Sequence, residues 1–148
     1  MLIWDVRAGV VARKPITGIN ICGDAIDIHD GFILTGQYTE RKQLNLHYLH
    51  DGELAEEILY NEKLPSEKST SVFTCQFQKL HHDIIVAGGS APNEIKVFDG
   101  DSQDPFEPCF KIKNLSRACL SVDFSNKGDM FACAGGDGVI RVFNVANE

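Results

Sequence analysis

A short apolar segment that ends in a ring-bearing side chain occurs four times along this chain of 148 residues. The four copies are Leu2–Asp5, Leu44–Tyr48, Ile95–Asp99 and Ile140–Asn144. Their ring-bearing positions are Trp4, His47, Phe98 and Phe143. Successive positions lie 43, 51 and 45 residues apart. This period predicts repeated supersecondary units, none of which buries its apolar face alone.

The end of the chain shows most clearly what one unit contains. Leu120–Val145 holds three β-favouring runs, which are Ser121–Phe124, Met130–Ala134 and Val139–Val145. The clusters that separate them are Asn126–Asp129 and Gly135–Gly138. Glycine, Asn and Asp adopt the positive φ that a close hairpin requires. The stretch therefore predicts three antiparallel strands joined by tight turns.

The same pattern is found ahead of the two middle copies. The inner strands that we expect there are Ala25–His29, Phe32–Thr35, Val72–Gln78 and Ile84–Ala87. An outer strand is expected after each of the first three copies, at Val10–Ile16, Leu54–Tyr60 and Pro108–Ile112. Leu54 and Ile58 are four residues apart and flank two glutamates, which leaves a short helix as the alternative for that segment. The repeat register favours a strand.

Repeats of this length with four strands each, and with the Trp4-Asp5 pair, resemble the WD40-repeat family. The resemblance covers the whole chain and implies an all-β fold of propeller blades. It implies one partial propeller domain over residues 1–148, with blade pieces 1–16, 17–60, 61–112 and 113–148 and 13 strands in all. Because the first piece holds two strands and the last holds three, we expect a C-terminal half-propeller. Missing blades, a partner or self-association would complete it.

Charge and composition exclude several functional classes. A net charge of −7 and a pI near 5.2 disfavour both a general nucleic-acid binder and docking on an anionic membrane. No apolar run has the length of a membrane helix, and Met1–Asp5 lacks the basic residues of a secretory signal. The five cysteines are widely spread, which favours a reducing, cytoplasmic location.

The resemblance also implies where partners would bind. In WD40 proteins the connections at one rim of the ring commonly contact peptides, and here the long ones are Gln37–Gln43, Asn61–Ser71 and Gly89–Asn93. We predict a non-catalytic scaffold whose rim contacts protein or peptide partners. The candidate contact residues are Glu40, Arg41, Lys42, Lys63, Lys68 and Arg117. The alternative for these loops is that they are tolerated surface insertions.

Other motifs are better explained without a catalytic or metal site. Asp137 lies six residues before Phe143, where the family has a buried hydrogen-bond network, but Phe143 replaces Trp and no His lies in 112–118, so we expect a turn residue. Asp99–Asp104 differs from a calcium loop, because the sixth position is Asp104 where Gly is required and the twelfth is Phe110 where Glu is required. No C-x-x-C occurs. The glycine runs lack the Lys-Ser/Thr of a phosphate loop. No cofactor is expected.

Two alternative functions belong to other classes. One is a structural subunit of a cytoskeletal or ciliary assembly, in which neighbours complete the half-propeller. The other is an enzyme or metal protein that uses His81-His82 or a rim carboxylate. The second lacks any local signature of an activated nucleophile, because no G-x-S-x-G motif is present and Cys75, Cys119 and Cys133 fall in expected inner strands.

Overall fold

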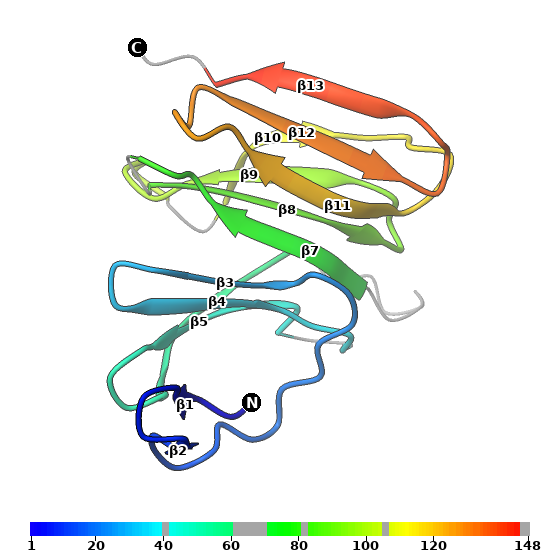
Figure 1. Ribbon diagram of the computed structural model, residues 1–148. Coiled ribbons are helices and arrows are strands. Elements are labelled where there is room, and N and C mark those ends of the chain that lie inside the picture. Colours follow the sequence, from blue (N-terminus) through cyan, green and yellow to red (C-terminus); the bar gives the residue numbers. More distant parts are fainter. Residues whose placement is uncertain (40–41, 61–70, 81–82, 105–106, 146–148) are drawn as a thin grey trace.

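The computed structural model describes residues 1–39, 42–60, 71–80, 83–104 and 107–145, and in these residues it is built of β-strands without a helix (Figure 1). The strands are β1 (Trp4–Asp5), β2 (Val10–Val11), β3 (Ile26–His29), β4 (Phe32–Gly36), β5 (Leu44–Tyr48), β6 (Leu54–Ile58), β7 (Ser71–Phe77), β8 (Ile84–Ser90), β9 (Ile95–Asp99), β10 (Pro108–Ile112), β11 (Cys119–Phe124), β12 (Met130–Gly135) and β13 (Ile140–Asn144). The described residues therefore include no helix that would cross a membrane.

The strands form four antiparallel sheets in which chain neighbours pair with each other. The orders are β1-β2, β3-β4-β5-β6, β7-β8-β9-β10 and β11-β12-β13. This confirms the predicted all-β fold of blade-like sheets and the division of the strands among them. The alternative helix at Leu54–Tyr60 is wrong, because Leu44 and Asn45 of β5 pair with Ile58 and Glu57 of β6.

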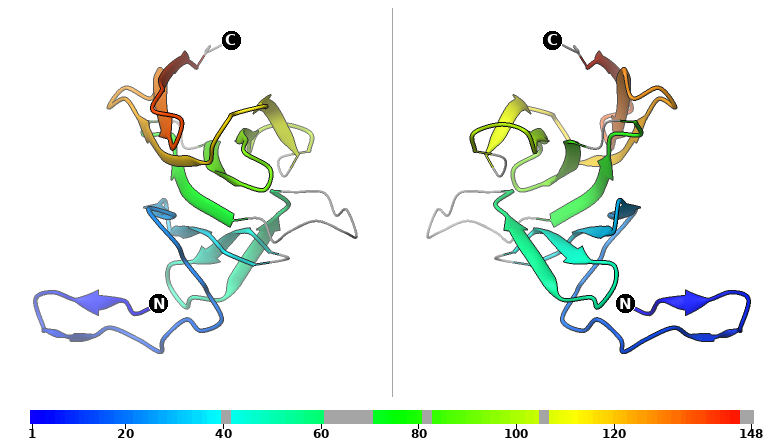
Figure 2. Two further views of the ribbon diagram at one scale, coloured as in Figure 1. Left: turned by 90° about the vertical axis from the view of Figure 1, so that its right-hand side faces the viewer. Right: turned by 90° about the vertical axis from the view of Figure 1, so that its left-hand side faces the viewer.

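The first outer strand is shorter than predicted. Val10–Ile16 was expected to be a strand throughout, but β2 ends at Val11. Pro15 has no N–H to contribute to a ladder, which limits pairing at that end. Single hydrogen bonds continue the contact, from Ala12 N to Ile3 O at 2.8 Å and from Ile16 N to Met1 O at 3.0 Å. Figure 2 shows the β1–β2 hairpin standing apart from the larger sheets.

The three larger sheets are stacked in chain order, and two apolar cores hold them together (Figures 1 and 2). The first core lies between β3–β6 and β7–β10 and includes Leu34, Leu44 and Phe98. The second lies between β7–β10 and β11–β13 and includes Ile95, Val97 and Val122. The middle sheet contributes alternate residues to the two cores, with Ile85 and Ala87 in the first and Val86 in the second, as the period of two in a strand requires.

Close approach of neighbouring sheets requires a glycine near the end of β8. A Cβ added to Gly88 would lie 2.6 Å from Cys119 Sγ of the next sheet. Carbon and sulfur do not approach to that distance, so a side chain here would push β11 outward. This glycine therefore sets the spacing between two sheets and does not serve a turn.

His47 occupies the position that Phe98 fills in the next sheet, and both are buried. Burial disfavours the charged imidazolium and lowers the pKa of His47, and a backbone contact with Gly52 offsets this only in part. At this buried position His47 serves as a packing residue. A packed imidazole nonetheless makes the stability of the fold depend on pH, whereas a phenylalanine at this position would not.

We expect His47→Phe to reduce the loss of stability in mild acid. The pKa of His47 in the folded state lies below its ordinary value of 6.5, so folding favours the neutral ring. Its stabilising contribution is present above pH 6.5 and is lost as pH falls through the folded-state pKa. Urea unfolding at about pH 7.5 and about pH 5.5 measures this difference.

The matched control is His50→Phe, because His50 is an exposed neighbour paired with Asp51 at 2.9 Å. His50→Phe should keep the wild-type difference between the two pH values. If the free energy of unfolding changes between the two pH values by the same amount in wild type and in His47→Phe, the pH dependence does not come from His47.

Candidate binding groove

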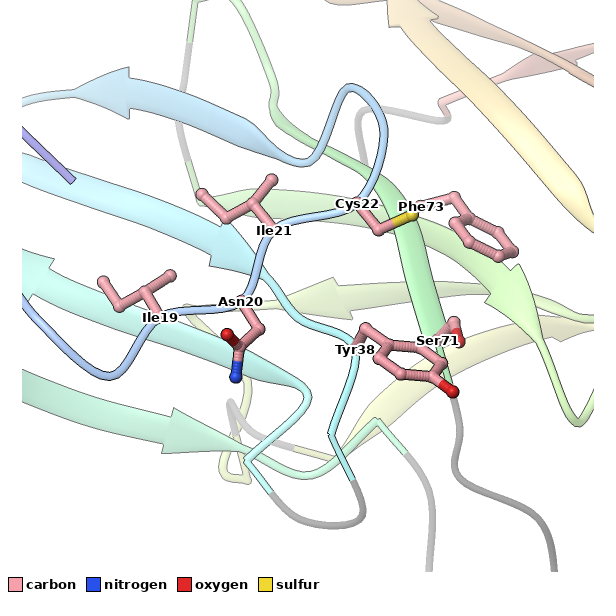
Figure 3. A pocket seen from close by; sticks show the side chains of 7 residues that line it. All are labelled: Ile19, Asn20, Ile21, Cys22, Tyr38, Ser71 and Phe73. Carbon is pink, nitrogen blue, oxygen red and sulfur yellow. The ribbon is translucent and has the colours of Figure 1, made fainter.

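A groove of about 430 Å³ opens where the chain enters the first and second large sheets (Figure 3). Its lining residues are Ile19, Asn20, Ile21, Cys22, Tyr38, Ser71 and Phe73. They come from three places: the segment before β3, the connection after β4, and the start of β7. We call this feature the rim groove. It lies among the connections that the sequence singled out for partner binding.

Backbone contacts fix the three walls of the rim groove relative to one another. Tyr38 N donates to Asn20 O at 2.9 Å, and Val72 N donates to Gln37 O at 3.2 Å. Tyr38 and Ser71 form an isolated antiparallel bridge, and Asp24 bridges Thr74 in parallel. The groove is therefore built on the junction between two sheets.

Gly23 allows the segment before β3 to lie against β7. Its φ is +92°, and an added Cβ would lie 2.5 Å from the carbonyl oxygen of Phe73. Both conditions exclude a side chain at this position, since L-residues rarely adopt such a φ. The turn at Gly23 thereby places Ile21 and Cys22 beside Phe73.

The lining of the rim groove is apolar with polar groups at intervals. Tyr38 is 56% exposed and Ile21 is 37% exposed, while Phe73 is partly buried. Figure 3 shows the Tyr38 ring beside Ser71, and the aliphatic side chains of Ile19 and Ile21 on the separate segment that precedes β3. Apolar surface with a few hydroxyl and amide groups is the usual composition of a site that holds an organic or peptide ligand.

The predicted contact residues are distributed unevenly over this region. Glu40, Arg41, Lys63 and Lys68 lie outside the described residues. Lys42 pairs with Glu57 of β6 at 2.5 Å across an exposed surface. Arg117 lies beside Gly136 of the β12–β13 turn. The structure does not bring Lys42 and Arg117 together, and both remain predictions as contact residues.

The apolar part of the groove was not anticipated from the sequence. Residues 17–24 were assigned to no strand, yet Ile19 and Ile21 supply one wall. Two signals were available: alternate isoleucines, and the glycines at positions 18 and 23 on either side of them. Such a pattern indicates an extended segment that lies against its neighbours without forming the regular hydrogen bonds of a β-ladder.

Asp137 is a turn residue as predicted, and it also pairs with a neighbour. Its Oδ1 accepts a hydrogen bond from Val139 N at 3.1 Å, and its Oδ2 pairs with Arg141 Nη2 at 2.7 Å. The Arg141 guanidinium is the main cause that lowers the pKa of Asp137. This ion pair orders the β12–β13 turn.

The remaining polar motifs show local roles. Asp99 Oδ1 accepts a hydrogen bond from Asp101 N at 3.0 Å, and Ser102 Oγ donates to Asp99 O at 2.8 Å, as expected of a polar turn. No group of three His, Cys, Asp or Glu side chains gathers as a metal site within the described ranges, and His81-His82 lies outside them. Cys75 is buried, which raises the pKa of its thiol.

No protein-family model matches this chain, and no curated protein is similar to it in sequence.

We predict that Gly23→Ala destabilises the fold more than Gly18→Ala. Both glycines have positive φ, so each substitution costs about 1–2 kcal/mol of backbone strain. Only at Gly23 does the new methyl group meet a neighbouring carbonyl, which adds about 1–3 kcal/mol. Denaturant unfolding of the two variants isolates the contact, since Gly18 has open space around it. If both variants lose the same free energy of unfolding, the segment that contains Gly23 is not packed against Phe73.

Proposed function

We propose that this chain is a non-catalytic scaffold of the WD40-repeat type that binds an extended peptide segment of a protein partner in the rim groove. The observation that carries the proposal is the rim groove itself, with Ile21 and Tyr38 exposed on a rigid junction of two sheets. Binding residues held on connections by a stable scaffold are the common arrangement in interaction modules.

The chemistry of the rim groove favours a peptide with a bulky apolar side chain. Apolar surface around Ile19, Ile21 and Phe73 gains free energy when it is covered, at about 25 cal/mol per Å². The Tyr38 hydroxyl and the Asn20 amide line the groove on exposed residues and offer hydrogen bonds to a peptide backbone. An extended segment presents both kinds of group at once.

The family assignment in this proposal rests on the repeat register and the sheet pattern. The aligned positions His47, Phe98 and Phe143 fall in the third strand of successive sheets. Arg41 and Lys42 belong to the predicted connection Gln37–Gln43, whose Tyr38 lines the groove. We propose that this connection contributes to the partner contact as well.

A library of random peptides displayed on phage and selected on the immobilised chain tests the proposal. We expect enrichment of peptides with a large apolar side chain. Ile21→Asp should weaken their binding at least about tenfold, because the complex would bury an unpaired carboxylate. Val6→Asp is the matched control, since Val6 is 91% exposed on the β1–β2 hairpin and outside the groove.

Selection that yields no consensus, or peptides that bind Ile21→Asp as tightly as wild type, would refute the proposal. The double substitution Arg41→Glu with Lys42→Glu separates the two parts of the site. It should change the charge preference of the selected peptides and leave their apolar residue unchanged.

A further inference from the structure

A second pocket, of about 160 Å³, lies between the segment that follows β6 and the strands β9 and β10. Three lysines line it, together with one glutamate and a buried tyrosine: Lys96, Lys111, Lys113, Glu94 and Tyr60. We call it the lysine pocket. It shares no lining residue with the rim groove, so a ligand bound here is independent of the proposed function.

The register of the sheet brings the lysines together. Lys111 of β10 pairs directly with Lys96 of β9, so the two side chains lie on the same face of the ladder. Lys113 comes two residues after Lys111, which is the repeat of one face in an extended chain, and it lines the same pocket. Like charges directly opposite each other destabilise a sheet. Because the chain as a whole has a net charge of −7, its composition does not explain this local concentration of positive charge.

One of the three ammonium groups is fixed in the wall of the lysine pocket. Lys96 is only 5% exposed, and its Nζ donates to Tyr60 O and lies 4.7 Å from the centre of the Tyr60 ring. The same Nζ is 3.7 Å from Glu94 Oε2, while the Tyr60 hydroxyl donates to Glu94 O at 2.6 Å. The charges of Lys96 and Glu94 therefore offset each other within a rigid cluster.

The other two ammonium groups have no such compensation. Lys111 and Lys113 are exposed, and neither makes an ion pair or a hydrogen bond in the part of the chain that the structure describes. With Lys96 and Glu94 offset, these two lysines leave the pocket with a formal charge of +2. An anion between them would remove their mutual repulsion, and a dianion would match their charge.

We propose that the lysine pocket binds the phosphoryl group of a phosphate monoester. Such a group carries a charge of about −1.5 to −2 near pH 7 and offers three acceptor oxygens, and lysine ammonium groups commonly bind it. A carboxylate would match only one of the two uncompensated charges. One liquid water occupies about 30 Å³, so the pocket has room for a phosphoryl group with a few waters. The group can come from a phosphorylated side chain of a protein partner or from a small phosphate ester.

Isothermal titration calorimetry with inorganic phosphate at constant ionic strength tests the proposal. We expect saturable binding to wild type, and binding at least about tenfold weaker for Lys111→Gln with Lys113→Gln. Both residues are exposed, so the substitutions leave the chain folded, which circular dichroism checks. The matched control is Lys14→Gln with Lys127→Gln, which removes the same charge from exposed residues outside the pocket and should bind as wild type does.

Two further titrations test the match of charge. Glu94→Gln should bind phosphate more tightly than wild type, because a carboxylate that lines the pocket is removed. Dimethyl phosphate, which carries a single negative charge, should bind wild type more weakly than inorganic phosphate does. A folded Glu94→Gln that binds phosphate no more tightly than wild type, or dimethyl phosphate that binds as tightly as phosphate, would contradict the proposal.

The two sources of the phosphoryl group are distinguished by free O-phosphoserine and a short phosphoserine peptide. Tighter binding of the peptide would assign the pocket to a phosphorylated partner, and equal binding would assign it to a small phosphate ester. In wild type, NMR should show phosphate-dependent shifts at the amides of Lys96 and Lys111 and none at Ile21 or Tyr38 of the rim groove. The proposal is overturned if wild type does not bind phosphate, if the Lys111 and Lys113 variant binds it as wild type does, or if the shifts lie elsewhere.

Discussion

The stack depends on how the edge N–H groups of each inner strand find an acceptor. An inner strand such as β11 lies at the edge of its own sheet, where half of its backbone groups have no ladder partner. Thr74 and Gln76 of the preceding sheet take up two of these groups, and Asp27 does the same for β7. Each such bond contributes about 0.5–1.5 kcal/mol, and leaving the N–H buried and unpaired would cost about 1–3 kcal/mol.

These bonds also fix the register in which the apolar faces meet. A shift of one residue along β11 would move Val122 away from the core and bring Asp123 into it. The same shift would leave the acceptors on β7 opposite the wrong side of the strand. The side-chain hydrogen bonds and the apolar packing therefore specify the same alignment of β7 and β11. The rim groove depends on the position of β7, because Ser71 and Phe73 belong to that strand.

Much of this fold could be predicted from the sequence. The alternation of residues and the glycine-containing turns located all of the strands, since both signals are local. The end of β2 was missed because the expected strand Val10–Ile16 contains Pro15, which has no N–H for a ladder. The roles of Asp27 and Gln76 could not be foreseen, because in sequence they look like solvent-facing positions of a half-buried strand. Only the stacking of sheets shows that both side chains accept hydrogen bonds from the next sheet.

The candidate site was predictable only in outline. The connections that surround it were identified by their length and charge, whereas Ile19 and Ile21 lie in a segment with no secondary structure of its own. Long-range contacts position that segment, and Gly23 permits them. Sequence patterns report local geometry well, but they do not say which extended segment will lie beside a given strand.

Native-state hydrogen exchange tests the central claim most directly. If side chains of the preceding sheet hold the edge N–H groups, the amides of Phe77, Val122 and Phe124 should exchange only through large-scale unfolding. The amide of Ile28, whose acceptor lies on its own exposed strand, should exchange much faster. Exchange of Phe77, Val122 and Phe124 as fast as that of Ile28 would contradict the account.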